Sequence, residues 1–152
     1  MKKLIQMLAV SVLGLFMSTA IVFAKPAVIG TVEQLSYTVL CDTAEQLEHM
    51  LITQKENSVQ AGVAIYKMYN SQLNDAGQPS CVFVQPPQAV TAAIGWLVST
   101  IEDVNWFDGK QHTLYIIAIL YEQNDGNWAE GFVYAGEAPV KAIELEPTGE
   151  AL

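Results

Sequence analysis

Arginine is absent from this sequence. All 7 basic residues are lysines, and they are outnumbered by 16 acidic residues, which gives a net charge of −9. Proteins that bind nucleic acids or anionic membranes need many cations, and arginine is the side chain that holds a phosphate through two parallel hydrogen bonds. The composition therefore excludes nucleic acid and anionic lipid as expected partners. It favours cationic partners, although acidity also serves solubility.

Histidine is scarce, with 2 residues, and so is cysteine, also with 2. Zinc sites usually take three or four protein ligands that include several of these side chains. The one local group is Glu45, Glu48 and His49, and only His112 could be added to it from a distant part of the chain. We interpret the group as a solvated helix surface with a favourable Glu–His pair, and a metal site is the alternative.

Catalytic and cofactor motifs are also lacking. The chain contains no Gly-x-Ser-x-Gly motif for a nucleophilic serine. Asp125 lies in an Asn-Asp-Gly-Asn run that lacks the alternating acids and closing Glu of a calcium loop, so it predicts a turn. Glu102 and Asp103 are sequence neighbours that would point to opposite sides of a strand. The sequence therefore predicts no enzyme, no cofactor and no metal.

The first 24 residues have the three parts of a Sec signal peptide. Lys2 and Lys3 precede an apolar run from Leu4 to Phe23, which ends at Ala24. This order predicts cleavage after Ala24 and a periplasmic or secreted protein without a stable membrane anchor. The alternative is an uncleaved anchor, because about 20 apolar residues can span a bilayer. A lipoprotein is disfavoured because no cysteine ends the run.

Cleavage would leave a single domain over residues 25–146 and a frayed tail over 147–152. Five lysines would remain against 16 acidic residues, a net charge of −11. In an oxidising compartment the two cysteines, Cys41 and Cys81, are expected to form a disulfide. A loop of about 40 residues closed in this way contributes roughly 4 kcal/mol in the chain-entropy account. A redox pair is the alternative, but the close C-x-x-C spacing is missing.

The first half of the mature chain predicts helices. Residues 25–34 are expected to be a loose lead-in, and 35–40 alternate as a strand does. Asp42 and Thr43 are candidate caps for a helix from Ala44, and Ser58 is a candidate cap for a second helix to about residue 69. Gly62 in its middle predicts a close approach by another element, because glycine there costs about 1 kcal/mol relative to alanine.

The second half predicts strands. Strands are expected over 82–84, 100–106, 113–121 and 128–134, with an edge strand over 140–146, while 89–98 fits strand or helix. The run 113–121 is almost continuously apolar, so it is expected to be the central strand. The fold class is therefore α+β: a helical hairpin packed on a strongly bent antiparallel sheet or small β-barrel, with one disulfide tying the helical insert to the sheet.

One resemblance accompanies this pattern. Cys41-Asp42-Thr43 opening a helix, followed by Gly62, Asn70 and Cys81 and then by short strands, resembles small exported bacterial proteins of uncharacterised function. The similarity covers about residues 40–135 and implies no activity. The chain departs from those proteins in lacking scattered basic residues.

Aromatic residues near two predicted turns form the candidate binding patch. They are accompanied by one acid, and the patch comprises Trp106, Phe107, Trp128, Glu130 and Phe132. Aromatics at strand spacing pack in cores or serve as exposed contact surfaces. The leading hypothesis is an exported, non-enzymatic domain that binds another macromolecule, such as a basic protein, in the manner of an inhibitor. The alternatives are an enzyme with a cleft between helices and sheet, and a structural envelope protein; the oligomeric state stays open.

Overall fold

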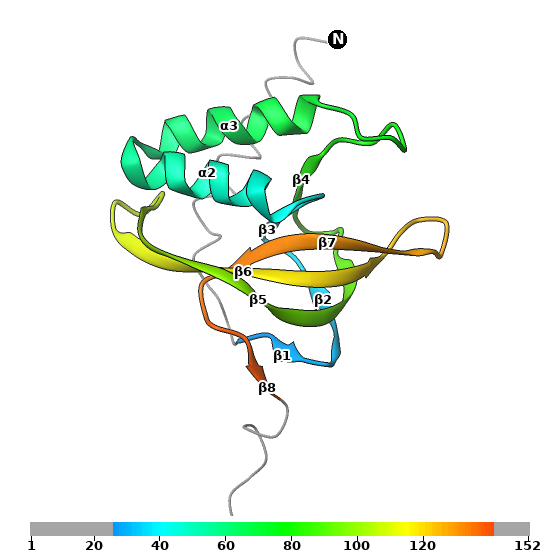
Figure 1. The fold of residues 1–152 in the computed structure, drawn as a ribbon. Helices are drawn as coiled ribbons and strands as arrows, with labels where there is room; N and C mark the ends of the chain where they lie inside the picture. The colour runs from blue at the N-terminus through cyan, green and yellow to red at the C-terminus, as the bar shows by residue number, and fades with distance from the viewer. Residues whose placement is uncertain (1–25, 142–152) are drawn as a thin grey trace, which may run out of the picture.

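The computed structural model describes residues 26–141 (Figure 1). The predicted leader (1–24), the tail (147–152) and most of the predicted edge strand at 140–146 lie outside these residues. The elements in chain order are β1 (Val28–Ile29), β2 (Val32–Leu35), β3 (Thr38–Cys41), α2 (Ala44–Glu56), α3 (Val59–Ser71), β4 (Cys81–Val84), β5 (Val90–Asn105), β6 (Gln111–Glu122), β7 (Trp128–Ala135) and β8 (Val140–Lys141).

The two helices form one layer over a strongly curled six-stranded sheet, as Figure 1 shows. The strand order is β2-β5-β6-β7-β3-β4, and every neighbouring pair is antiparallel. β1 and β8 form a separate parallel pair. The α+β prediction, with a helical hairpin on a bent antiparallel sheet and one disulfide, is confirmed.

Both helices begin where the sequence predicts. The Thr43 hydroxyl accepts a hydrogen bond from the Gln46 backbone, and the Gln46 side chain accepts one from the Thr43 backbone, which completes a capping box. The Ser58 hydroxyl caps α3 by accepting from the Ala61 N–H. Gly62 lies against the buried side chain of Gln54 on α2, so the predicted close approach is between the two helices.

The strands differ from the sequence prediction in three places. The predicted strand 35–40 is interrupted at residues 36–37, between the end of β2 and the start of β3, because Tyr37 has a positive φ of 58° that breaks the extended backbone. The ambiguous stretch 89–98 and the predicted strand 100–106 form one continuous strand, β5, which is interrupted by three irregularities in its pairing with β6. The lead-in also contains β1 and β2, and β2 pairs with the start of β5. Local patterning misses β2 because short strands are stabilised mainly by their partner.

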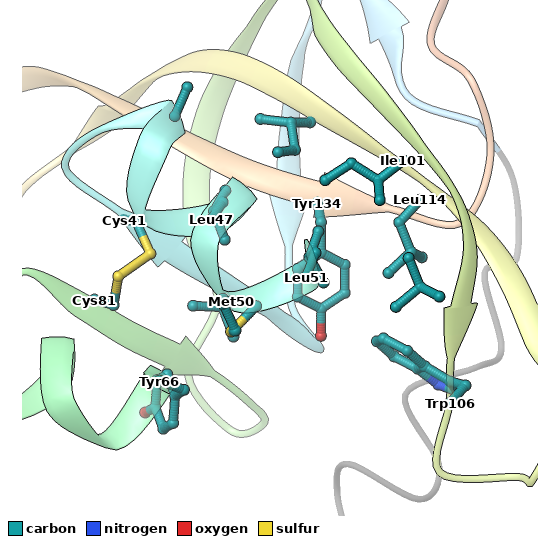
Figure 2. Close-up of a cluster of buried hydrophobic side chains, with 14 residues drawn as sticks. Cys41, Leu47, Met50, Leu51, Tyr66, Cys81, Ile101, Trp106, Leu114 and Tyr134 are labelled. Atoms are coloured by element: carbon teal, nitrogen blue, oxygen red, sulfur yellow. A yellow bond between two sulfur atoms is a disulfide. The ribbon is translucent and has the colours of Figure 1, made fainter. Parts of the chain in front are cut away.

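The sheet has an apolar core on each side, and β6 contributes to both. On the side covered by the helices, here called the helix face, Leu114 and Ile116 pack with Leu47 and Leu51 of α2. Figure 2 shows these α2 side chains directed toward the sheet residues of this cluster. On the opposite side, the far face, Ile117 and Ile119 pack with Leu40 and Ile94. The prediction that 113–121 is the central strand is confirmed, and it is covered on both sides from Leu114 to Ile119 but not at Leu120, which is 51% exposed.

The disulfide joins Cys41 at the end of β3 to Cys81 at the start of β4. These residues are directly opposite in the antiparallel pair, with Cα atoms 4.1 Å apart. The bond therefore closes the base of the helical insert, residues 42–80, at the point where it leaves the sheet. Both cysteines are 1% exposed.

Candidate binding face

The helices cover only part of the helix face. From the middle of β6 to its end, successive residues on this face include Ile116, Ala118 and Leu120, and their exposed fractions are 0%, 1% and 51%. Ile116 lies opposite Ser99, whose hydroxyl donates to a Glu48 carboxylate oxygen of α2 at 3.0 Å. Coverage by α2 therefore extends to the Ser99 row and ends before Leu120.

Large apolar side chains lie beyond this limit. Residues directly opposite on paired strands point to the same face of the sheet. The register places Trp96 in one row with Ala118 and Phe132, and it places Leu120 in the next row with Val32 and Glu130. Trp128 lies opposite Glu122 in the row after that. Trp96 is 59% exposed, Trp128 48% and Val32 62%. We call the surface formed by Val32, Trp96, Leu120, Trp128 and Glu130 the aromatic face.

A bulge places Trp96 on this surface. Ile94 and Trp96 are two residues apart and would share a face in a regular strand, yet Ile94 packs in the far-face core. The pairing shifts between them, so Trp96 lies opposite Ala118 instead. Gly95 permits the shift, because a Cβ there would lie 2.6 Å from the Ala118 carbonyl oxygen. Sequence reasoning missed Trp96 because the bulge is invisible to a period-two pattern.

The predicted patch of five residues is divided by the structure. Trp106 and Phe107 adjoin the β5–β6 turn, whereas Trp128 and Glu130 follow the β6–β7 turn. These turns are at opposite ends of β6, a strand of 12 residues, whose length along the chain is at most about 40 Å. The five residues are thus not one surface, and the grouping is corrected: hairpin turns that follow one another in sequence lie at opposite ends of the shared strand.

Trp106 is a core residue. It is 3% exposed, and its ring makes edge-to-face contacts with Phe107 at 5.4 Å and Tyr134 at 5.6 Å between centroids. Phe132 is half-buried against the same core. Trp128 and Glu130 are exposed. The sequence left open whether these aromatic residues pack in the core or lie on the surface. Trp106 and Phe132 pack against the core, whereas Trp128 lies on the surface.

Charge around the aromatic face is negative. Glu130 lies in the same row as Leu120, Glu122 is paired with Trp128, and Glu48 adjoins the covered edge at Ser99. The four lysines of residues 26–141 are elsewhere: Lys55 and Lys67 on the helices, Lys110 at the β5–β6 turn and Lys141 on β8. Apolar side chains bordered by carboxylates suit a contact surface that is apolar and basic.

The other candidate residues make local structural contacts. His49 Nδ1 is 2.8 Å from the Tyr69 hydroxyl, and Asp125 accepts a hydrogen bond from the Asn127 N–H in its turn. Asp108 accepts one from the Lys110 N–H and lies 2.8 Å from His112 Nε2, and the first of these bonds contributes most to lowering its pKa. Within residues 26–141, no three His, Cys, Asp or Glu side chains gather as a metal site would require.

One small cavity lies between the helices and the sheet. The cavity there has a volume of about 10 Å³ and is lined by residues that include Gln54, Tyr66, Trp106 and Tyr134. That volume accommodates about one water molecule. Burial raises the pKa of Tyr134 and, less strongly, that of Tyr66.

No protein-family model matches this chain, and no curated protein or solved structure is significantly similar to it. None of the helices within residues 26–141 is long and apolar enough to cross a bilayer.

Proposed function

We propose that this protein is an exported, non-enzymatic domain that binds a basic protein through the aromatic face. The observation that carries the proposal is the exposure of Trp96, Leu120 and Trp128 on adjoining rows of one sheet face. Contiguous apolar patches on soluble proteins mark interaction sites, whereas singly scattered apolar residues do not. Tryptophan is also the residue type most enriched among the energetically dominant residues of protein interfaces.

The basic character of the partner follows from charge. Glu122 and Glu130 flank the aromatic face, and the chain after residue 24 has five lysines against 16 acids. Such a surface attracts cationic proteins over distances of about 8–10 Å at moderate ionic strength and raises their encounter rate. Specific retention then depends on the apolar contact. An inhibitor of a basic extracellular enzyme is one concrete form of this function.

Export supports this setting. The Cys41–Cys81 bond suits an oxidising compartment, and residues 1–24 have the pattern of a cleaved leader. The protein recovered from the periplasm or medium should begin at Lys25 by intact mass. A full-length product confined to the cytoplasm would be incompatible with this part of the proposal.

Binding is tested with the oxidised domain from Lys25 against a panel of basic secreted proteins, with association and dissociation rates measured at low and at physiological salt. Trp128→Ala and Trp96→Ala should each weaken binding by about 2 kcal/mol, roughly 30-fold, mainly by faster dissociation. Glu130→Gln should mainly slow association at low salt. Met68→Ala is the matched control, because Met68 is 38% exposed on α3 and lies outside the aromatic face.

Each tryptophan variant needs a folded-state check. Trp96 and Trp128 are both about half exposed, so their alanine variants should keep the thermal stability of the wild type to within about 1 kcal/mol. If the panel contains no protein retained at low salt, the proposal is wrong. It is also wrong if Met68→Ala weakens binding as much as the tryptophan variants do.

A further inference from the structure

A second surface feature lies beside the aromatic face. It is an open hollow of about 640 Å³ between two parts of the chain: β4 with the preceding loop on one side, and the end of β6 with the following turn on the other. In Figure 1 the loop before β4 and the β6–β7 turn both extend to the right of the view. The volume falls within the range of about 300–1,000 Å³ that is usual for small-molecule sites.

The apolar lining of the hollow continues the far-face core. Leu40 and Val84 are buried members of that core, and Val90 and Tyr121 pack against it. The Tyr121 ring lies over Gly131, where an added Cβ would be 2.9 Å from a ring carbon. Tyr121 is half-buried, so part of this aromatic ring remains available on the surface of the hollow.

The polar lining consists largely of amides. These side chains are Asn74, Gln78, Gln88, Gln123 and Asn124. Asn74 is engaged, because its Nδ2 donates to Asp42 at 3.1 Å and its Oδ1 accepts from the backbone of Ala76 and Gln78. Within residues 26–141 the other four amide side chains make no hydrogen bond in the structure. Each therefore has a donor and an acceptor to offer to a ligand.

Charge in the hollow excludes some ligand classes. The lining contains two carboxylates, Asp42 and Glu122, and no lysine. A phosphate or carboxylate ligand would find no cation to pair with and two anions to repel it. A purely apolar ligand would leave several amides without partners when it displaced their water.

We propose that this hollow binds a neutral, hydroxyl-rich ligand, namely a short oligosaccharide. Each sugar hydroxyl is both a donor and an acceptor, as each amide is, and a carboxylate can accept from neighbouring hydroxyls. The exposed part of the Tyr121 ring offers an apolar surface for the C–H face of a sugar ring. None of the five residues that define the aromatic face lines this site, and the two adjoin at Glu122, which is paired with Trp128.

The test titrates the isotope-labelled, oxidised domain from Lys25 with maltotriose, cellotriose and tri-N-acetylchitotriose, and follows the side-chain amide resonances by NMR. Open, solvent-exposed sites bind small neutral ligands weakly, so a Kd of about 1 mM is expected for at least one of these sugars. The resonances of Gln78, Gln88, Gln123 and Asn124 should shift in a saturable way. Those of Gln60, which is exposed on α3 outside the hollow, should not.

Variants then assign the site. Gln88→Ala and Gln123→Ala should each weaken binding by about 3–10-fold, the effect of removing one hydrogen bond. Gln60→Ala is the matched control and should bind as the wild type does, and so should Trp128→Ala, which keeps this test independent of the protein-binding proposal.

Three results would overturn the inference. In the first, none of the three sugars shifts the hollow resonances at tens of millimolar. In the second, the double variant Gln88→Ala/Gln123→Ala binds as tightly as the wild type. In the third, the protonated, deacetylated chitotriose binds while the neutral sugars do not, which would show that Asp42 and Glu122 select a cation instead.

Discussion

Replacing Gly62 with alanine tests how closely α2 and α3 pack. A Cβ at position 62 would lie 2.5 Å from Oε1 and 2.7 Å from Cβ of Gln54. The second contact decides the outcome, because the Gln54 Cβ is fixed to the α2 backbone and cannot rotate away as the end of a flexible side chain can. Gly62→Ala therefore requires the two helices to separate.

The magnitude combines opposing effects. Alanine in a helix interior is favoured over glycine by about 1 kcal/mol. Overpacking costs about 1–3 kcal/mol. Gln54 is 3% exposed, and its Nε2 donates to the Asn105 carbonyl at 2.6 Å; displacing it would leave buried polar groups unpaired, at about 1–3 kcal/mol. The net expectation is a loss of about 2 kcal/mol in the free energy of unfolding.

The assay is urea unfolding of the oxidised domain, followed by circular dichroism. Ala64→Gly is the matched control, because Ala64 is exposed on the same helix and its replacement should cost only the intrinsic preference of about 1 kcal/mol. Glycine is thus expected to be the better residue at 62 and alanine the better one at 64. A Gly62→Ala protein as stable as the wild type would refute the close packing of the helices.

Three further predictions follow from other parts of the fold. Cys41→Ser with Cys81→Ser should lower the free energy of unfolding by about 4 kcal/mol, since the bond spans 40 residues; a midpoint in urea unchanged from that of the oxidised wild type would contradict this. Burial raises the pKa of Tyr134 in the folded protein, so the contribution of this residue to the free energy of unfolding is complete below the unfolded pKa of about 10 and is lost as pH rises above it. The free energy of unfolding should therefore fall between pH 8 and about 11, and Tyr134→Phe should reduce this fall. Gly95→Ala should disturb the bulge that places Trp96 on the aromatic face, because the added Cβ would be 2.6 Å from a backbone oxygen. We expect both a lower free energy of unfolding and weaker binding of a basic protein. Wild-type values for both quantities would show that the bulge tolerates a side chain.

Features determined by near neighbours in the chain could be predicted from the sequence. The caps at Thr43 and Ser58 depend on a side chain and an N–H three residues later, and both are present. Gly109 and Gly126 adopt the positive φ that their turns require. The nearly continuous apolar run of β6 predicted that its side chains are buried on both faces of the sheet along most of the strand.

Features that depend on strand register were decided only by the tertiary structure. Trp106 and Trp128 have similar sequence surroundings, next to aspartate–glycine turns, yet one is 3% exposed and the other 48%. The difference arises because α2 and α3 cover one end of the sheet and leave the other bare, which no local pattern encodes. The same holds for the amides of the hollow, which come from three separate segments, the α3–β4 loop, the β4–β5 loop and the β6–β7 turn, and meet only in the folded structure.

The sequence by itself therefore determined the two helices with their caps, most of the strands of the second half, and the acidic charge, because these depend on residue type and on contacts within a few positions. It also determined the disulfide, because the chain has two cysteines to pair. The tertiary structure alone decided which aromatic side chains reach the surface. Side-chain direction along a strand reverses with every residue, so the single bulge at Gly95 transfers Trp96 from the far-face pattern to the helix face. Its exposure there also requires that α2 end its coverage at the Ser99 row, a contact between residues 51 positions apart.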